Sequence, residues 1–188
     1  MRDMREPQFT LSIDPGIRGC GVALWNWGYI KDGLIQAKYI CGSKGKDVTR
    51  GSNEKNVTCG SKEKDVTRSW YEAGLGVDAL VRSWGGVVRE VIIEWPQIYR
   101  HSKGDPNDLL LLAGVAGIYT QKYSHSSKIV LYKPAQWKGQ IPKPIHHKRI
   151  IERLGSAIDR VELPKNKKLQ ADVWDAVGLG LYHLGKVK

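Results

Sequence analysis

Four acidic residues at the ends of predicted elements are the part of this sequence best suited to chemistry. Asp14 ends the apolar stretch in "LSIDPG", and Glu94 ends another in "VVREVIIEW". Asp172 and Asp175 lie three residues apart in a predicted helix, so their side chains share one face. Because a buried carboxylate is costly unless something binds it, two acids at the ends of apolar strands need an explanation.

Each of these acids also has an ordinary structural explanation. Asp14 could be a turn residue that hydrogen-bonds its own backbone. Asp172 and Asp175 could belong to an exposed helix start, where acidic side chains interact favourably with the helix dipole. These alternatives stay open when each site is considered alone.

The four acids together predict a metal site. If the two strands are parallel neighbours, Asp14 and Glu94 emerge at the same edge of the sheet, where active sites of such sheets form. Four converging carboxylates repel one another unless cations neutralise them, and Mg²⁺ prefers oxygen ligands. Two such ions about 3.5–4 Å apart can activate water and stabilise the leaving oxygen during phosphodiester cleavage.

The elements that would position these acids follow in the order βββ, then αβαβ, then α. Strands are predicted at 8–14, 19–26, 28–40 and 87–95, with a further short strand that ends before Pro134. Helices are predicted at 70–84, 105–123, 144–155 and 169–185. "NWG" is a plausible hairpin turn between the second and third strands. This order predicts an α/β fold, a mixed sheet flanked by helices.

A repetitive segment interrupts this pattern at residues 41–67. It consists of three tandem nonapeptides, CGSKGKDVT, RGSNEKNVT and CGSKEKDVT. One valine in nine residues cannot offset the entropy of ordering the segment. We therefore expect one domain over 1–188 with an inserted polar loop at 41–67, whose lysines are either solvated or in contact with nucleic acid.

The charge of the chain favours a polyanionic partner. The formal net charge is +11, and residues 133–168 hold ten Lys and Arg against three Asp and Glu. The sequence contains no apolar run near the roughly 18 residues of a membrane helix, and residues 1–10 lack the apolar core of a secretion signal. We expect a cytoplasmic protein without a membrane partner.

Three stretches resemble a known family. "SIDPGIRGCGVALW", "VIIEWPQIY" and "DVWDAVGLGLYH" are similar, in that order, to the motifs of the RuvC family of Holliday junction resolvases. The resemblance implies a ribonuclease H-like fold with a five-stranded mixed sheet. It also implies a homodimer that uses Mg²⁺ or Mn²⁺ to nick two opposing strands of a four-way DNA junction. The residues that it implies as catalytic and metal-binding are Asp14, Glu94, Asp172 and Asp175.

The same resemblance implies contacts to branched DNA and to a second subunit. The residues implied as DNA-binding are Trp95 and Tyr99, as candidates for an aromatic wedge, and Lys138, Lys143, Lys148 and Arg149. The helix at 105–123 occupies the place of the dimer-interface helix, although a fully buried core helix is the alternative. If it forms the interface, a charge at Leu111 or Leu112 should produce monomers. The resemblance also implies that the protein acts in the cytoplasm of a bacterial cell or of a phage-infected host.

Two other functions remain open at this point. "DPGIRGCGVA" also resembles the start of the YqgF-like nucleases, a group thought to act on RNA. A junction-binding protein without nuclease activity is the second alternative. A sugar-kinase-like ATPase is excluded, because that architecture needs two such domains and 188 residues leave room for one.

Overall fold

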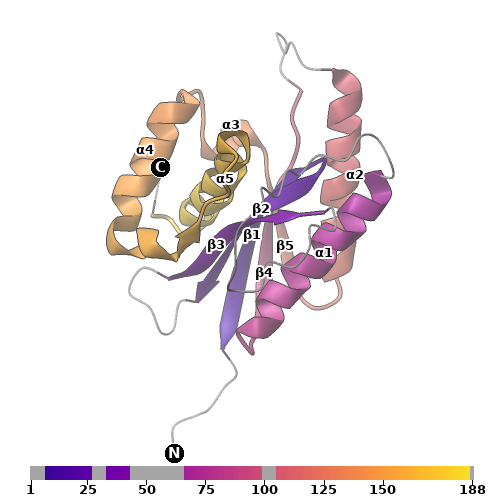
Figure 1. The fold of residues 1–188 in the computed structure, drawn as a ribbon, viewed down its shortest axis with the longest axis horizontal. Coiled ribbons are helices and arrows are strands. Elements are labelled where there is room, and N and C mark those ends of the chain that lie inside the picture. Colours follow the sequence, from indigo (N-terminus) through magenta and orange to yellow (C-terminus); the bar gives the residue numbers. More distant parts are fainter. Residues whose placement is uncertain (1–6, 27–32, 43–65, 99–104, 187–188) are drawn as a thin grey trace, which may run out of the picture.

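A six-stranded mixed sheet forms the centre of the molecule (Figure 1). The structure is a computed structural model, and it describes residues 7–26, 33–42, 66–98 and 105–186. The strands lie in the order β5-β4-β1-β2-β3-β6. They are β1 (Gln8–Gly16), β2 (Gly19–Asn26), β3 (Leu34–Cys41), β4 (Val87–Glu94), β5 (Lys128–Tyr132) and β6 (Val161–Glu162).

Helices cover both faces of this sheet. They are α1 (Val66–Ser83), α2 (Pro106–Tyr123), α3 (Pro134–Trp137), α4 (Lys143–Leu154), the 3₁₀ helix η1 (Gly155–Arg160) and α5 (Lys167–His183). α1 and α2 pack on one face, whereas α5 packs on the other with α3 and α4 beside it (Figure 1). The two layers bury separate hydrophobic clusters.

The alternation of side chains along β1 decides which residues face which layer. Leu11 and Ile13 are fully buried in the cluster beneath α1 and α2. Ser12 points to the opposite face, where its hydroxyl donates a hydrogen bond to the Ala176 carbonyl of α5 at 2.8 Å. Because side chains of a strand alternate, Asp14 lies on the same face as Ser12, toward α5.

Most of the predicted elements are confirmed, with one correction to the sheet. Five strands were expected and six are present. The additional strand, β6, is two residues long and pairs in parallel with Ala37 and Lys38 of β3. Two residues are too few for a periodic pattern, so no sequence signal could identify this strand.

Two predictions fall largely on residues outside the described part of the chain. The "NWG" turn includes residues 27–28, and the repeat segment includes residues 43–65. At the borders of the repeat segment, Cys41 ends β3 and Val66 begins α1, so those borders belong to regular elements. Within the described residues, no helix is both long and apolar enough to span a membrane.

Candidate active site

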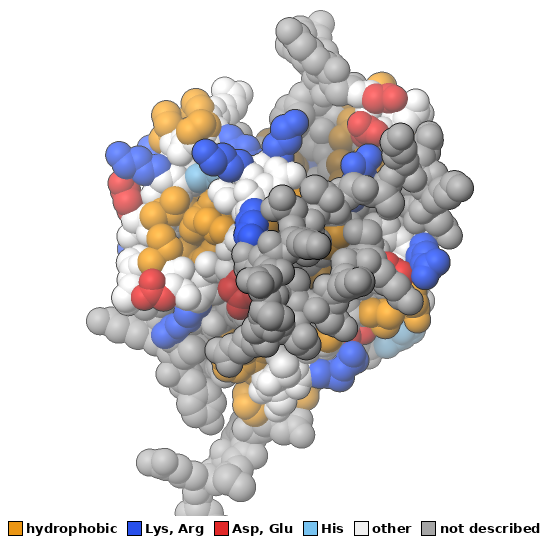
Figure 2. Space-filling view, viewed as in Figure 1, with side chains coloured by type: hydrophobic (Ala, Val, Ile, Leu, Met, Phe, Trp, Pro, Cys, Tyr) orange, Lys and Arg blue, Asp and Glu red, His pale blue; other side chains and the backbone are white. Residues whose placement is uncertain are grey.

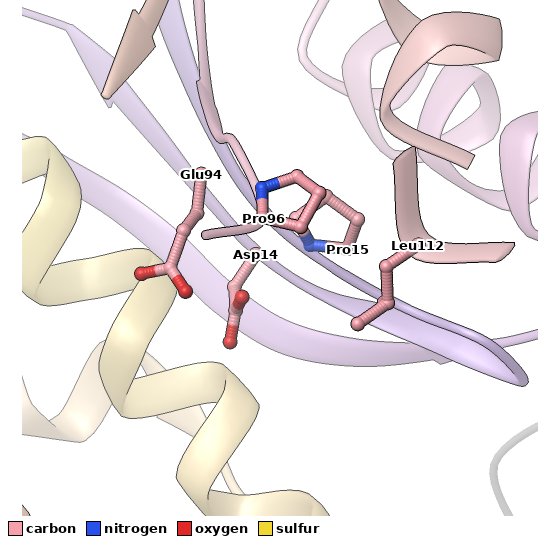
Figure 3. Close-up of a pocket in the computed structure, with 5 residues that line it drawn as sticks. All are labelled: Asp14, Pro15, Glu94, Pro96 and Leu112. Atoms are coloured by element: carbon pink, nitrogen blue, oxygen red, sulfur yellow. The ribbon is translucent and has the colours of Figure 1, made fainter. Parts of the chain in front are cut away.

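Asp14 and Glu94 lie next to each other at one edge of the sheet. β1 and β4 are parallel neighbours, and Ile13 pairs with Ile93, so the following residue of each strand is an acid. Both carboxylates line a small pocket, and their side chains point toward α5 (Figure 3). The condition that the sequence left open, that the two strands are parallel neighbours, is therefore met, and both acids lie at the same edge.

α5 carries the other two acids over this edge. Asp14 pairs with Gly21 in the β1–β2 ladder, and a Cβ atom at Gly21 would overlap the backbone carbonyl of Asp172. Glycine therefore lets the helix backbone lie directly on β2 beside Asp14. The bond from Ser12 to the Ala176 carbonyl holds the next turn, so Asp172 and Asp175 both face the strand-end acids.

Three of the four acids, Asp14, Glu94 and Asp172, have raised pKa values. Burial, followed by the charges of Glu94, Asp175 and Asp172, raises the pKa of Asp14 well above its ordinary value. Burial also raises the pKa of Glu94, although Lys138 opposes this shift. For Asp172, burial and the neighbouring carboxylates outweigh Lys143 and raise the pKa to about 6. These three carboxylates lack sufficient neutralising charge from the protein.

Asp175 has the opposite environment. It is almost fully buried, which by itself raises the pKa of its carboxyl group. His147 Nε2 lies 2.9 Å from Oδ1, and Lys143 Nζ and Lys138 Nζ lie 2.8 and 3.3 Å from Oδ2. These partners outweigh burial, so the pKa of Asp175 is lowered below its usual range.

The short helix α3 places two further side chains on Glu94. The indole Nε1 of Trp137 donates a hydrogen bond to Glu94 Oε2 at 2.8 Å, and Lys138 Nζ lies 3.1 Å from the same oxygen. Lys138 Nζ also lies 4.7 Å from the centre of the Trp137 ring, within the range of a cation–π contact. Lys138 thus connects the strand-end acid with Asp175 on α5.

The four carboxylates fit a hard divalent ion in their chemistry. Oxygen is the donor that Mg²⁺ and Mn²⁺ prefer, and the raised pKa values of Asp14 and Asp172 indicate a site that a cation would stabilise. As the described side chains stand, no three of the His, Cys, Asp and Glu residues are arranged to hold a metal ion. Glu94 Oε2 and Asp175 Oδ2 are instead directed at the Lys138 ammonium.

Comparisons with known proteins give a structural likeness and no sequence match. No protein-family model matches the sequence, and no curated protein matches it. RuvC of Thermus thermophilus aligns with a TM-score of 0.53 at 18% identity, over 96% of this chain and 98% of that chain. The same RuvC in complex with a Holliday junction substrate gives 0.53 at 13% identity, over 96% and 98%.

A viral structure gives a similar result. The Fowlpox virus resolvase in complex with its substrate Holliday junction DNA aligns with a TM-score of 0.51 at 12% identity, over 94% of this chain and 97% of that chain. This chain therefore shares the fold of these proteins. The ribonuclease H-like fold class expected from the motifs is thereby confirmed. At these identities the likeness concerns the fold, so the chemistry rests on the residues of the site.

Within this resolvase fold, the six residues predicted to contact DNA fall into different environments. Lys138 and Lys143 contact the acids of the site, whereas Lys148 and Arg149 are exposed on α4. Figure 2 shows several basic side chains in the upper left part of the molecule. Trp95 is half-buried against the hydrophobic cluster beneath α1 and α2. Tyr99 lies outside the described residues.

The helix α2 contributes a wall to the site that the sequence did not predict. Leu112 lines the pocket beside Asp14, Pro15 and Pro96 (Figure 3). Leu111, in contrast, is exposed on the outer side of the helix. A charge at Leu112 would therefore also alter the pocket beside Asp14, whereas a charge at Leu111 would lie on the exposed surface.

Three residues of the site escaped the sequence analysis. Gly21 had a recognisable signal, because a glycine inside an apolar strand often marks a close backbone approach. His147 follows another histidine in "PIHHKRI", a pattern that matches no metal-binding motif such as H-E-x-x-H. Trp137 gave no signal, because its bond to Glu94 depends on how α3 packs against the sheet.

Proposed function

We propose that this protein is a metal-dependent endonuclease that cleaves phosphodiester bonds in four-way DNA junctions. The observation that carries the proposal is the convergence of Asp14, Glu94, Asp172 and Asp175 at one edge of the sheet. Such a cluster of mutually repelling carboxylates is unfavourable for folding alone, and its oxygen donors suit divalent cations. Its position on a resolvase fold supports the junction as the substrate.

The four acids are the residues that would hold Mg²⁺ or Mn²⁺, with two ions per site as the proposed number. A divalent ion bound there supplies Lewis acidity, which polarises the phosphate and lowers the pKa of water. The chain itself contributes position and charge. Trp137 and the Ser12–Ala176 bond hold Glu94 and α5 in place, and Lys143 brings a positive charge to Asp175.

The substrate class follows from the charge around the site. α4 begins at Lys143 beside Asp175 and carries Lys148 and Arg149 on its exposed surface, so a DNA backbone that enters the site would meet these cations. RuvC of Thermus thermophilus and the Fowlpox virus resolvase have both been solved with Holliday junction DNA. We propose the same branched substrate for this chain.

A homodimer completes the proposal. Leu110, Leu111 and Ile118 form an exposed apolar stripe on α2, and the glycines Gly114 and Gly117 lie between them along the helix. A junction of near two-fold symmetry is matched by a two-fold enzyme that places its two sites on opposing strands.

The test compares cleavage and binding by the wild-type protein and Asp14→Asn. A labelled mobile four-way junction is incubated with and without Mg²⁺, with a linear duplex and a structured RNA as competing substrates. We expect junction-selective, Mg²⁺-dependent nicking by the wild type. Asp14→Asn should lose several orders of magnitude in cleavage rate, because it loses a negative ligand. Its metal-free junction binding should persist or tighten, because an anion near the phosphates is removed.

Asp159→Asn is the matched control, because it removes one exposed carboxylate from η1, away from the described site. It should cleave at the wild-type rate. A folded Asp14→Asn protein that cleaves as fast as the wild type would show that the site is misassigned. Preferential cleavage of the structured RNA would favour the YqgF-like alternative.

A further inference from the structure

The Lys138 ammonium has an unusual position among the cations of the site. It lies 3.1 Å from Glu94 Oε2 and 3.3 Å from Asp175 Oδ2, so one charge bridges an acid of the sheet and an acid of α5. Lys143 and His147, both on α4, contact Asp175. These two contacts therefore connect α4 with α5 and do not reach the sheet. Among the described cations, the bridge between strand and helix is made by Lys138.

This bridge lies in surroundings that hold it in place. The side chain of Lys138 is 21% exposed, and its partners Glu94 and Asp175 are 15% and 3% exposed. Burial by itself lowers the pKa of Lys138, but the carboxylates of Glu94, Asp175 and Asp14 outweigh it and leave the pKa above its ordinary value. The Trp137 ring supports the ammonium from one side. Lys138 is therefore a positive charge held between two acids in the metal-free site.

A divalent cation that used these two acids would need the same oxygens. An ammonium and a metal ion cannot both contact Glu94 Oε2 and Asp175 Oδ2 at bonding distance, because two cations a few ångströms apart repel strongly in a poorly solvated site. The Lys138 side chain has four methylene groups, and it can move its charge toward solvent without moving α3.

We propose that the Lys138 ammonium competes with the divalent cation for Glu94 Oε2 and Asp175 Oδ2, so that metal binding displaces the lysine from its bridge. This inference rests on the proposed function, since it concerns how the same acids are loaded. Lys138 holds the two acids together before loading and lowers the apparent affinity of the site for metal. Removing its charge should strengthen metal binding while weakening the link between α5 and the sheet.

The experiment measures Mn²⁺ binding to the purified protein without DNA, by isothermal titration calorimetry at pH 7.5. The variants are Lys138→Met, which keeps the unbranched shape but is one atom shorter and uncharged, and Lys138→Arg, which keeps the charge. We expect Lys138→Met to bind Mn²⁺ at least fivefold more tightly than the wild type. Lys138→Arg should bind with the affinity of the wild type or more weakly.

Lys128→Met is the control for net charge, because Lys128 makes an exposed ion pair with Glu90 at 2.8 Å, on the same strand as Glu94 but four residues earlier. It removes one Lys–Glu pair and one unit of charge without touching the four acids, and its Mn²⁺ affinity should equal that of the wild type. A gain in Lys128→Met as large as in Lys138→Met would reduce the effect to net charge and overturn the proposal.

Unchanged or weaker Mn²⁺ binding by Lys138→Met also overturns it, as does the absence of detectable binding in both proteins. If Lys138→Met does not fold, Lys138→Gln is measured in its place. Junction cleavage by the wild type is scored separately. Cleavage together with equal Mn²⁺ affinities would reject the competition and leave the proposed function standing. Tighter Mn²⁺ binding by Lys138→Met without any junction cleavage by the wild type would support the competition and reject the proposed function.

Discussion

Asp172 and Asp175 are three residues apart on α5, yet their carboxyl groups have opposite pKa shifts. Asp175 meets His147, Lys143 and Lys138, and these partners lower its pKa despite burial. Asp172 is partly buried beside other carboxylates, and its pKa rises to about 6. The identity of the residue is the same in both cases, so the difference comes from which side chains of α3 and α4 reach each carboxylate.

The raised pKa of Asp172 leads to a prediction about stability and pH. Because the folded protein keeps the Asp172 proton up to about pH 6 while the unfolded chain releases it near 3.8, stability from this group falls as pH rises through that window. Asp172→Asn is neutral at every pH. In EDTA it should therefore be more stable than the wild type at pH 7.5, by about 1–3 kcal/mol, and the difference should shrink toward pH 4.

Urea denaturation at pH 7.5 and pH 4.5 measures this difference. The exposed Asp159→Asn serves as the control and should change the free energy of unfolding little at either pH. A destabilisation by Asp172→Asn at pH 7.5 would show that the Asp172 carboxylate is satisfied by the protein, contrary to the electrostatics described here.

At the scale of elements, close approaches between backbones and rings bring the acids together. α5 lies on β2 at Gly21, and a Cβ atom at Gly178 would lie 2.8 Å from the Trp137 ring and 3.2 Å from His146 Nε2. The close approach at Gly178 lets α3 and α4 pack against α5. This packing brings Lys138 and Lys143 to the acids of the site. Periodicity predicts that these helices exist. It does not predict where they touch, because that depends on small residues at particular positions.

Gly21→Ala tests this control of helix position. The added methyl group overlaps backbone atoms of Asp172, which cannot rotate away, so α5 must move off the sheet. We expect a loss of about 1–3 kcal/mol in unfolding free energy, as for other overpacked cores. Metal-dependent cleavage should fall by at least tenfold, because a displacement of about 1 Å in a catalytic site can cost that much or more.

Gly74→Ala on α1 provides the comparison, since the nearest atom to its added methyl group would be the side-chain Nζ of Lys122 at 3.4 Å rather than backbone. This variant should be as stable as the wild type or more stable, because alanine favours a helix over glycine. Thermal unfolding and cleavage are measured on both proteins. Full activity and stability in Gly21→Ala would mean that α5 does not depend on this close approach.

At the scale of the whole molecule, the sequence was sufficient for the sheet around the acids and insufficient for its surroundings. Apolar runs that end on Asp14 and Glu94 correctly predicted two strands, and the parallel pairing on which their common edge depends is present in the sheet. The short strand β6 has no periodicity of its own, and the roles of Trp137 and His147 arise from long-range packing. Contacts between residues far apart in the chain are the ones that pattern analysis could not supply.

The outer surface of α2 leads to the last prediction, which concerns the dimer. Leu110 is 72% exposed, Leu111 36% and Ile118 40%, whereas Val115, Ala116 and Tyr119 form the buried face of α2. Their spacing forms one stripe, and Gly114 and Gly117 would let a second helix approach closely. Burying this stripe in a two-fold interface removes apolar surface from water, which favours association.

A charge in the centre of this stripe should therefore separate the subunits. We expect light scattering to give a dimer for the wild type at micromolar concentration and a monomer for Leu111→Glu combined with Ile118→Glu. The monomer should keep its fold by circular dichroism but nick the two opposing strands of a junction independently rather than together. Leu163→Glu, at a leucine 42% exposed in the connection between β6 and α5, should remain dimeric. A wild-type monomer that resolves junctions with paired nicks would contradict the dimer, because one site cannot reach both strands in a single encounter.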